Sequence, residues 1–198
     1  MAKTLEFIFD FASPNAYLAY RALPPILART GAALKLIPCL LGGIFKATGN
    51  QAPMIAFGGV QGKMAYEMLE TRRFIEKHGL SAFRMNPNFP VNTLLLMRCA
   101  CAADMEGRLV PFVEAALPMM WEQGLKMDDP AVAANALGEA GFGDLIDKVG
   151  TDPVKAVLVA NTQNAVDRGA FGIPTFFVGD EMFFGKDRLG QVEEVLTG

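Results

Sequence analysis

Histidine and cysteine are scarce in this sequence, which removes several kinds of catalytic site from consideration. The 198 residues contain one histidine, His78, and three cysteines, Cys39, Cys99 and Cys101. A single histidine leaves little material for Ser-His catalysis or for a His-based metal site. The cysteines are odd in number and form no C-x-x-C pair, so neither a disulfide framework nor a zinc site is indicated. We therefore expect buried thiols and no bound metal.

Basic clusters and long apolar runs are also missing. The formal net charge is −3 and the pI is about 5.2, so binding to nucleic acid or to an anionic membrane is not expected. No apolar run is long enough to span a bilayer. Acidic Glu6 and Asp10 interrupt the first apolar residues, so no signal peptide is expected and the cytosol is the predicted location. The mean hydropathy of +0.26 is high for a soluble monomer and indicates a homodimer with a buried interface.

The chain is organised around the stretch from Phe7 to Tyr20. Alternating apolar residues predict a strand that stops at Asp10. Ser13 then reads as a helix N-cap and Pro14 as the first helical residue. The serine hydroxyl would lie beside free backbone N–H groups and the positive end of the helix dipole, where an anion can bind. The simpler interpretation, in which Ser13 only caps its helix, is common for an isolated Ser-Pro pair.

The first half of the chain predicts a βαβ unit followed by helices. The Pro24-Pro25 pair should kink or interrupt the first helix. Residues 34–38 predict a second strand, parallel to the first. Residues 40–62 are rich in glycine and predict a long loop, of the kind that is often functional. Lys46 in this loop could point an ammonium group into a site or lie on the surface.

The last part of the chain predicts a hairpin and a final helix. Residues 174–178 and 181–184 flank the turn pair Gly179-Asp180. Asp187 is a credible N-cap for the final helix, and a helix N-terminus beside a lysine and an arginine suits a carboxylate ligand. The predicted class is an α/β protein with a thioredoxin-like fold. Residues 1–42 and 151–198 would form this discontinuous domain, and residues 43–150 an inserted all-helical domain.

Four separated motifs resemble those of the 2-hydroxychromene-2-carboxylate isomerases. This family is related to the kappa-class glutathione transferases and has a DsbA-like thioredoxin fold. The motifs are FDFASPNAYLA (9–19), KATGN (46–50) with a proline following, FPVNT (89–93) and FGIPTFFVGDEMFFGKDRL (171–189). The resemblance spans the whole chain, and the last motif is the most specific.

The resemblance implies glutathione as the cofactor and assigns residues to two parts of a site. A cis bond before Pro174 would let Ile173 present backbone groups to the cysteinyl part of glutathione. Ser13 would hydrogen-bond the glutathione thiolate, since this chain has no cysteine at the helix start and Ala16 replaces the second cysteine of redox relatives. The γ-glutamyl end would be held by Phe184, Gly185, Lys186, Asp187 and Arg188. A second substrate, an anionic aromatic α-keto acid, would face Lys46, Asn50, Pro53 and Asn92.

The function implied by the resemblance is a glutathione-dependent isomerase without a metal. It would interconvert 2-hydroxychromene-2-carboxylate, or a similar aromatic ring-cleavage product, with trans-o-hydroxybenzylidenepyruvate through transient thiolate addition. One alternative is a kappa-type transferase that conjugates glutathione to electrophiles. Another is a non-catalytic glutathione-binding or protein-interaction module. Residues 40–62 would decide the choice of substrate.

Overall fold

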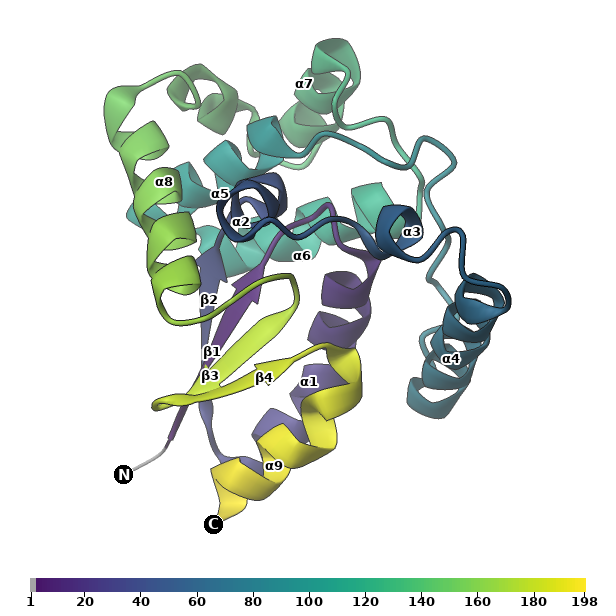
Figure 1. The fold of residues 1–198 in the computed structure, drawn as a ribbon. Helices are drawn as coiled ribbons and strands as arrows, with labels where there is room; N and C mark the ends of the chain where they lie inside the picture. Colours follow the sequence, from purple (N-terminus) through teal and green to yellow (C-terminus); the bar gives the residue numbers. More distant parts are fainter. Residues whose placement is uncertain (1–2) are drawn as a thin grey trace.

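The computed structural model describes residues 3–198, and a four-stranded sheet of order β2-β1-β3-β4 lies at its centre (Figure 1). Strand β1 (Thr4–Phe9) is parallel to β2 (Ala33–Pro38) and antiparallel to β3 (Thr175–Val178). Strand β4 (Glu181–Phe184) follows β3 across the predicted Gly179-Asp180 turn and forms one edge of the sheet. Every residue of β3 is buried, whereas β4 is mostly exposed. The predicted βαβ unit and hairpin are both present.

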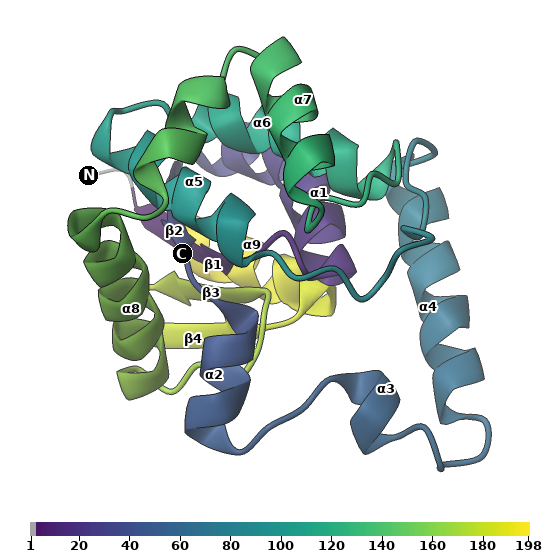
Figure 2. The same cartoon turned by 90° about the horizontal axis from the view of Figure 1, so that it is seen from above.

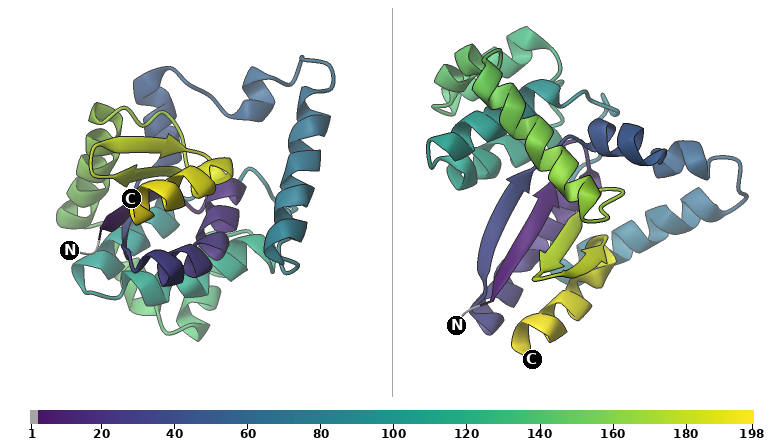
Figure 3. Two further views of the ribbon diagram at one scale, coloured as in Figure 1. Left: turned by 90° about the horizontal axis from the view of Figure 1, so that it is seen from below. Right: turned by 60° about the vertical axis from the view of Figure 1, so that its left-hand side comes forward.

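Helices cover both faces of this sheet (Figures 1 and 3). Helices α1 (Pro14–Thr30) and α9 (Leu189–Thr197) lie on one face. They are joined by a bidentate ion pair in which Arg29 donates to both carboxylate oxygens of Glu193, at 2.6 and 2.9 Å. Helices α8 (Asp152–Asp167) and α5 (Leu94–Met105) pack against β2 on the other face. Among residues 3–198, no helix combines the length and the apolar character needed to cross a membrane.

The expected interruption of the first helix at Pro24-Pro25 is wrong, because α1 continues through both prolines to Thr30. The alternative, a kink, stays a prediction. Both proline rings lie on the exposed side of the helix. The carbonyl groups that lose a hydrogen-bond donor there can bind water instead. The side chains of Leu23 and Ile26, which are buried on the other side of the helix, therefore stabilise it beside the prolines.

The long loop expected over residues 40–62 is also wrong, because this stretch contains α2 (Leu41–Thr48) and α3 (Pro53–Ala56). Ile44 is fully buried, and α2 packs against α8. A Cβ on Gly43 would lie 3.0 Å from the Thr162 methyl carbon of α8. That glycine permits a close approach of two helices, although from the sequence it looks like a loop residue. The predicted division at residue 43 falls inside α2 and stays a prediction.

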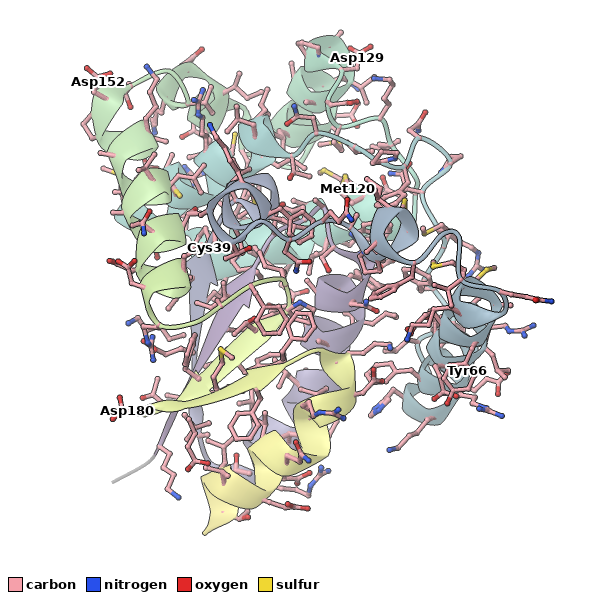
Figure 4. The ribbon with its side chains drawn as sticks, in the orientation of Figure 1. Cys39, Tyr66, Met120, Asp129, Asp152 and Asp180 are labelled. Carbon is pink, nitrogen blue, oxygen red and sulfur yellow. The ribbon has the colours of Figure 1, made fainter. Side chains whose placement is uncertain are left out.

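The remaining helices complete the part of the chain between β2 and α8. They are α4 (Lys63–His78), α6 (Leu109–Trp121), α7 (Pro130–Glu139) and the 3-10 helix η1 (Gly143–Lys148). Residues 53–78, here called the α3–α4 arm, extend away from the body of the molecule (Figure 2). Only Phe74 is buried within its two helices. The arm exposes the large apolar side chains of Met54, Ile55, Phe57, Val60, Tyr66 and Met68; Figure 4 marks Tyr66 on α4.

Trp121, at the end of α6, joins the helical layer to the turn before Ser13. It is completely buried, and its indole Nε1 donates a hydrogen bond of 2.9 Å to the carbonyl oxygen of Phe11. The rings of Phe83 and Phe89 pack beside it, each with its centroid 6.0 Å away. The position of the Ser13 turn thus depends on a residue more than 100 positions later in the chain.

We expect Trp121→Phe to lower the free energy of unfolding by about 3 kcal/mol, because it leaves a buried carbonyl unpaired and opens a cavity. Urea unfolding followed by far-ultraviolet circular dichroism measures this loss, since Trp121 is the only tryptophan and its fluorescence disappears with it. Phe112→Leu is the control, because this buried neighbour of Phe11 loses ring volume without losing a hydrogen bond. Equal losses in the two variants would show that the indole hydrogen bond contributes nothing.

Candidate active site

The Ser13 hydroxyl lies where the first strand turns into the first helix. The N–H of Ser13 donates to the Asp10 carbonyl at 3.2 Å, which closes a tight turn after β1. Ser13 Oγ accepts a hydrogen bond from the Ala16 N–H at 3.2 Å, so the predicted N-cap is confirmed. The same hydroxyl donates to the Ile173 carbonyl oxygen at 3.0 Å. The structure therefore places this hydroxyl at the positive end of α1 and against the loop before β3.

The Ile173-Pro174 peptide bond is cis, as the resemblance implies. Ile173 is buried, and its N–H has no acceptor among residues 3–198. A backbone N–H without a protein acceptor can donate to water or to a ligand. The N–H of Gly185 donates to the Pro174 carbonyl at 2.9 Å, which brings the end of β4 to the same place. Ser13, Ile173, Pro174 and Gly185 are thus brought together from both ends of the chain.

Asp10 holds three segments together beneath Ser13. Its carboxylate is only 1% exposed and accepts hydrogen bonds from the Ala12 N–H at 2.9 Å, the Leu41 N–H at 2.8 Å and the Thr93 hydroxyl at 2.5 Å. Burial raises the pKa of this carboxyl, and the three hydrogen bonds act in the opposite direction. Sequence reasoning missed this role. The available signal was an acidic residue directly after a buried strand and three positions before an N-cap.

The four residues predicted to face a second substrate all lie at the surface. Lys46 is exposed in the last turn of α2, and its ammonium group has no ion pair among residues 3–198. Pro53 is exposed at the start of α3. Asn92 is exposed, and its Oδ1 accepts from the Leu94 N–H at 3.0 Å. Asn50 donates from Nδ2 to the Phe171 carbonyl at 2.8 Å, so its amide positions the loop before β3.

The residues after β4 are arranged differently from the expectation. Asp187 is not the N-cap of the last helix, because the 3-10 helix η2 (Lys186–Arg188) intervenes and α9 begins at Leu189. Lys186 is only 4% exposed. Its Nζ lies 3.1 and 3.2 Å from the two Asp187 carboxylate oxygens and 5.3 Å from the centroid of the Phe74 ring. The Asp187 carboxylate thus forms an ion pair with the neighbouring Lys186, whose side chain lies toward α4.

Lys186 and Asp187 border a cleft between α1, α4 and the start of α9. Its volume is about 440 Å³, and Phe74, Arg73 and Pro25 are among its lining residues. A volume of this size is typical of small-molecule sites. Ser13 and Ile173 do not line it. A ligand that contacts both Ser13 and Lys186 would therefore reach beyond this cleft.

The chain's own cysteines supply no reactive thiol to this site. Cys39, Cys99 and Cys101 are free and buried, which confirms the expected buried thiols. Burial raises the pKa of Cys99 and of Cys101 to about 12, and it also raises the pKa of Cys39. Within residues 3–198, no three His, Cys, Asp or Glu side chains are grouped as metal ligands. A thiolate that reaches Ser13 must come from a bound molecule.

Comparison with known proteins agrees with this architecture. The model of the DSBA-like thioredoxin domain family matches residues 4–197. The chain belongs to this family. It is also 30% identical to a 2-hydroxychromene-2-carboxylate isomerase of Sphingobium xenophagum over 201 aligned residues, which cover 99% of both chains. These matches confirm the predicted fold class and the expected relationship to the 2-hydroxychromene-2-carboxylate isomerases.

A kappa-class transferase and a solved isomerase structure are also similar to this DSBA-like chain. Glutathione S-transferase kappa 1 of Rattus norvegicus is 28% identical over 94% of this chain and 88% of its own length. A solved structure of a 2-hydroxychromene-2-carboxylate isomerase superimposes with a TM-score of 0.82 at 24% identity, covering 98% of this chain and 94% of that one. The solved isomerase thus shares this fold, and the kappa transferase is similar in sequence along nearly the whole chain.

We expect Asp10→Asn to lower the free energy of unfolding by about 3 kcal/mol, because the amide nitrogen cannot accept a hydrogen bond and would face a backbone N–H or the Thr93 hydroxyl. Thr93→Val removes one of the three donors and should cost about half as much. Urea unfolding of both variants and the parent protein measures the difference. Equal stability of the Asp10→Asn variant and the parent protein would contradict the proposed linking role.

Proposed function

We propose that this protein is a glutathione-dependent isomerase that interconverts 2-hydroxychromene-2-carboxylate, or a similar aromatic ring-cleavage product, with trans-o-hydroxybenzylidenepyruvate. The observation that carries the proposal is the position of Ser13 Oγ, at the start of α1 and 3.0 Å from the carbonyl oxygen of Ile173. The names of the relatives with which it shares its whole length support the same reaction class.

The residues present fit glutathione by their chemistry. The unpaired N–H of Ile173 and the carbonyl beside the cis proline match the backbone groups of a cysteinyl residue, as in an added strand. Lys186, Asp187 and Arg188, with Phe184 and Gly185 before them, supply charge and backbone for the γ-glutamyl end.

Bound glutathione would supply a thiolate that adds to the conjugated double bond, permits rotation and leaves again. Ser13 would turn its hydroxyl proton from the Ile173 carbonyl toward the sulfur, and the dipole of α1 would favour the charged thiolate. Lys46, whose ammonium group has no ion pair among the described residues, would bind the carboxylate of the second substrate and stabilise charge on its oxygen. Asn50, Pro53 and Asn92 would shape the space around it.

A kappa-type transferase is the second candidate, because the kappa 1 relative from rat matches nearly the whole chain. The two activities differ in their products, since a transferase accumulates a glutathione adduct and an isomerase does not. Chromatography of the reaction mixture separates them. A non-catalytic binding module would bind glutathione and turn over neither kind of substrate.

We expect Ser13→Ala to lower kcat of the glutathione-dependent isomerisation about 100-fold, because the variant loses the hydrogen-bond donor to the thiolate. The assay follows the absorbance of 2-hydroxychromene-2-carboxylate and its open isomer, with and without glutathione. Glutathione should remain bound in calorimetry, since the groups for its γ-glutamyl end are intact.

Asp129→Ala is the matched control for the lost helix cap. Asp129 caps α7 through hydrogen bonds from the Ala131 and Val132 N–H groups, and it lies at the start of α7 in Figure 4. Each substitution removes one cap and should cost about 1 kcal/mol of stability. Undiminished turnover by the Ser13→Ala variant would refute the role of Ser13.

We also propose that the protein is a cytosolic homodimer joined through the α3–α4 arm. The arm exposes several large apolar side chains, and exposed patches of that kind often mark an interface. The three free cysteines suit a reducing compartment.

Light scattering should therefore give a mass about twice the 21.4 kDa of the chain. Met68→Glu should shift the protein toward the monomer, because it places a charge in the apolar face of α4. Val159→Glu on α8 is the control, since Met68 and Val159 are both 68% exposed. A monomeric parent protein, or an equal effect of both substitutions, would contradict the arm interface.

A further inference from the structure

Two aromatic rings lie in contact with each other at the surface beside the Ser13 site. Phe171 is 39% exposed and Phe184 is 41% exposed. Their ring centroids are 4.5 Å apart, with an angle of 46° between the ring planes. Single exposed apolar residues are ordinary in folded proteins, but two rings that form a joint surface at the end of a buried segment need an explanation. Residues 172–178, which follow Phe171, are all buried.

The pair is held in place from three sides. Phe184 lies over Gly172, where an added Cβ would be only 2.8 Å from the Phe184 ring. The Asn50 amide donates to the Phe171 carbonyl at 2.8 Å and so ties the pair to the segment between α2 and α3. The Gly185 N–H donates to the Pro174 carbonyl at 2.9 Å and holds the end of β4. The surface is therefore preorganised, which lowers the entropic cost of binding a rigid ligand.

Phe171 is also close along the chain to the residue that the Ser13 hydroxyl contacts. Ser13 Oγ contacts the carbonyl of Ile173 at 3.0 Å, and Phe171 precedes Ile173 by two residues, so their Cα atoms are at most about 7 Å apart. Aromatic side chains bind flat rings by offset or edge-to-face contact.

We propose that the Phe171–Phe184 pair binds the aromatic ring of the second substrate and makes the enzyme select aromatic over aliphatic conjugated α-keto acids. This inference rests on the proposed function and assigns a specificity-determining role to Phe171. This residue opens the 171–189 motif, but the sequence analysis gave it no role of its own. Phe184, which the resemblance places beside the γ-glutamyl end of glutathione, would present its outer ring face to the second substrate. Asn50 would act mainly as a positioning residue for Phe171.

Calorimetry with phenylpyruvate and pyruvate, in the presence of S-methylglutathione, tests the pair without any turnover. We expect Phe171→Leu to weaken phenylpyruvate binding about tenfold while leaving pyruvate and S-methylglutathione binding within twofold. Phe171→Tyr should retain the parent affinity for phenylpyruvate, because the ring is kept. Met182→Ala is the control, since Met182 is a similarly exposed apolar residue on β4 outside the ring pair.

Turnover provides the second measurement. With Phe171→Leu, KM for the aromatic isomerase substrate should rise about tenfold, and KM for an aliphatic conjugated α-keto acid should stay within twofold. Unchanged phenylpyruvate binding in the Phe171→Leu variant, or no preference of the parent protein for phenylpyruvate over pyruvate, overturns the inference. If Phe171→Leu weakened self-association and left ligand binding unchanged, the ring pair would instead form a contact between two copies of the chain, and the inference would be overturned.

If the parent protein shows this calorimetric pattern but no glutathione-dependent isomerisation, the aromatic contact stands and the proposed function is refuted. Failure of the inference and failure of the proposed function are therefore distinguishable.

Discussion

The buried carboxylate of Asp10 is the constraint on which the site depends. An ionised carboxylate removed from water is costly unless donors surround it. Here the donors come from the Ser13 turn, the start of α2 and the start of α5. These hydrogen bonds link the segments that carry Lys46 and Asn92 to the turn that carries Ser13. The packing of α2 on α8 holds the first of these segments as well.

A second link connects this assembly to the hairpin. The Ser13 hydroxyl joins α1 to Ile173, and Trp121 joins α6 to Phe11 within the turn. The candidate site is therefore built from backbone and side-chain groups of four distant segments. With the chain's own thiols buried and their pKa values raised, serine in this frame suits a protein that activates a thiol carried by a ligand.

The segments around the candidate site differ in how firmly they are held. Glycine at position 172 and the Asn50 amide hold the Phe171–Phe184 rings against the sheet. The α3–α4 arm, in contrast, buries only Phe74 within its helices and leaves most of its apolar side chains exposed. Firm positioning suits recognition of a rigid substrate, whereas an exposed apolar arm suits contact with a second chain.

Local physics determined much of this protein from the sequence alone. The Ser13 cap, the Gly179-Asp180 hairpin and the alternating strand β1 depend on neighbours a few residues away, so composition and spacing were sufficient. The cis bond before Pro174 and the isomerase family followed from motif resemblance. Only the tertiary structure decided that α1 passes through Pro24-Pro25, that Gly43 belongs to a helix packed on α8, and that Asp187 pairs with Lys186 instead of capping α9. It also decided the surroundings of Asp10 and Phe171. Asp10 accepts hydrogen bonds from Leu41 and Thr93, 31 and 83 positions later, and the Phe171 carbonyl accepts one from Asn50, 121 positions earlier. These partners meet only when the chain has folded.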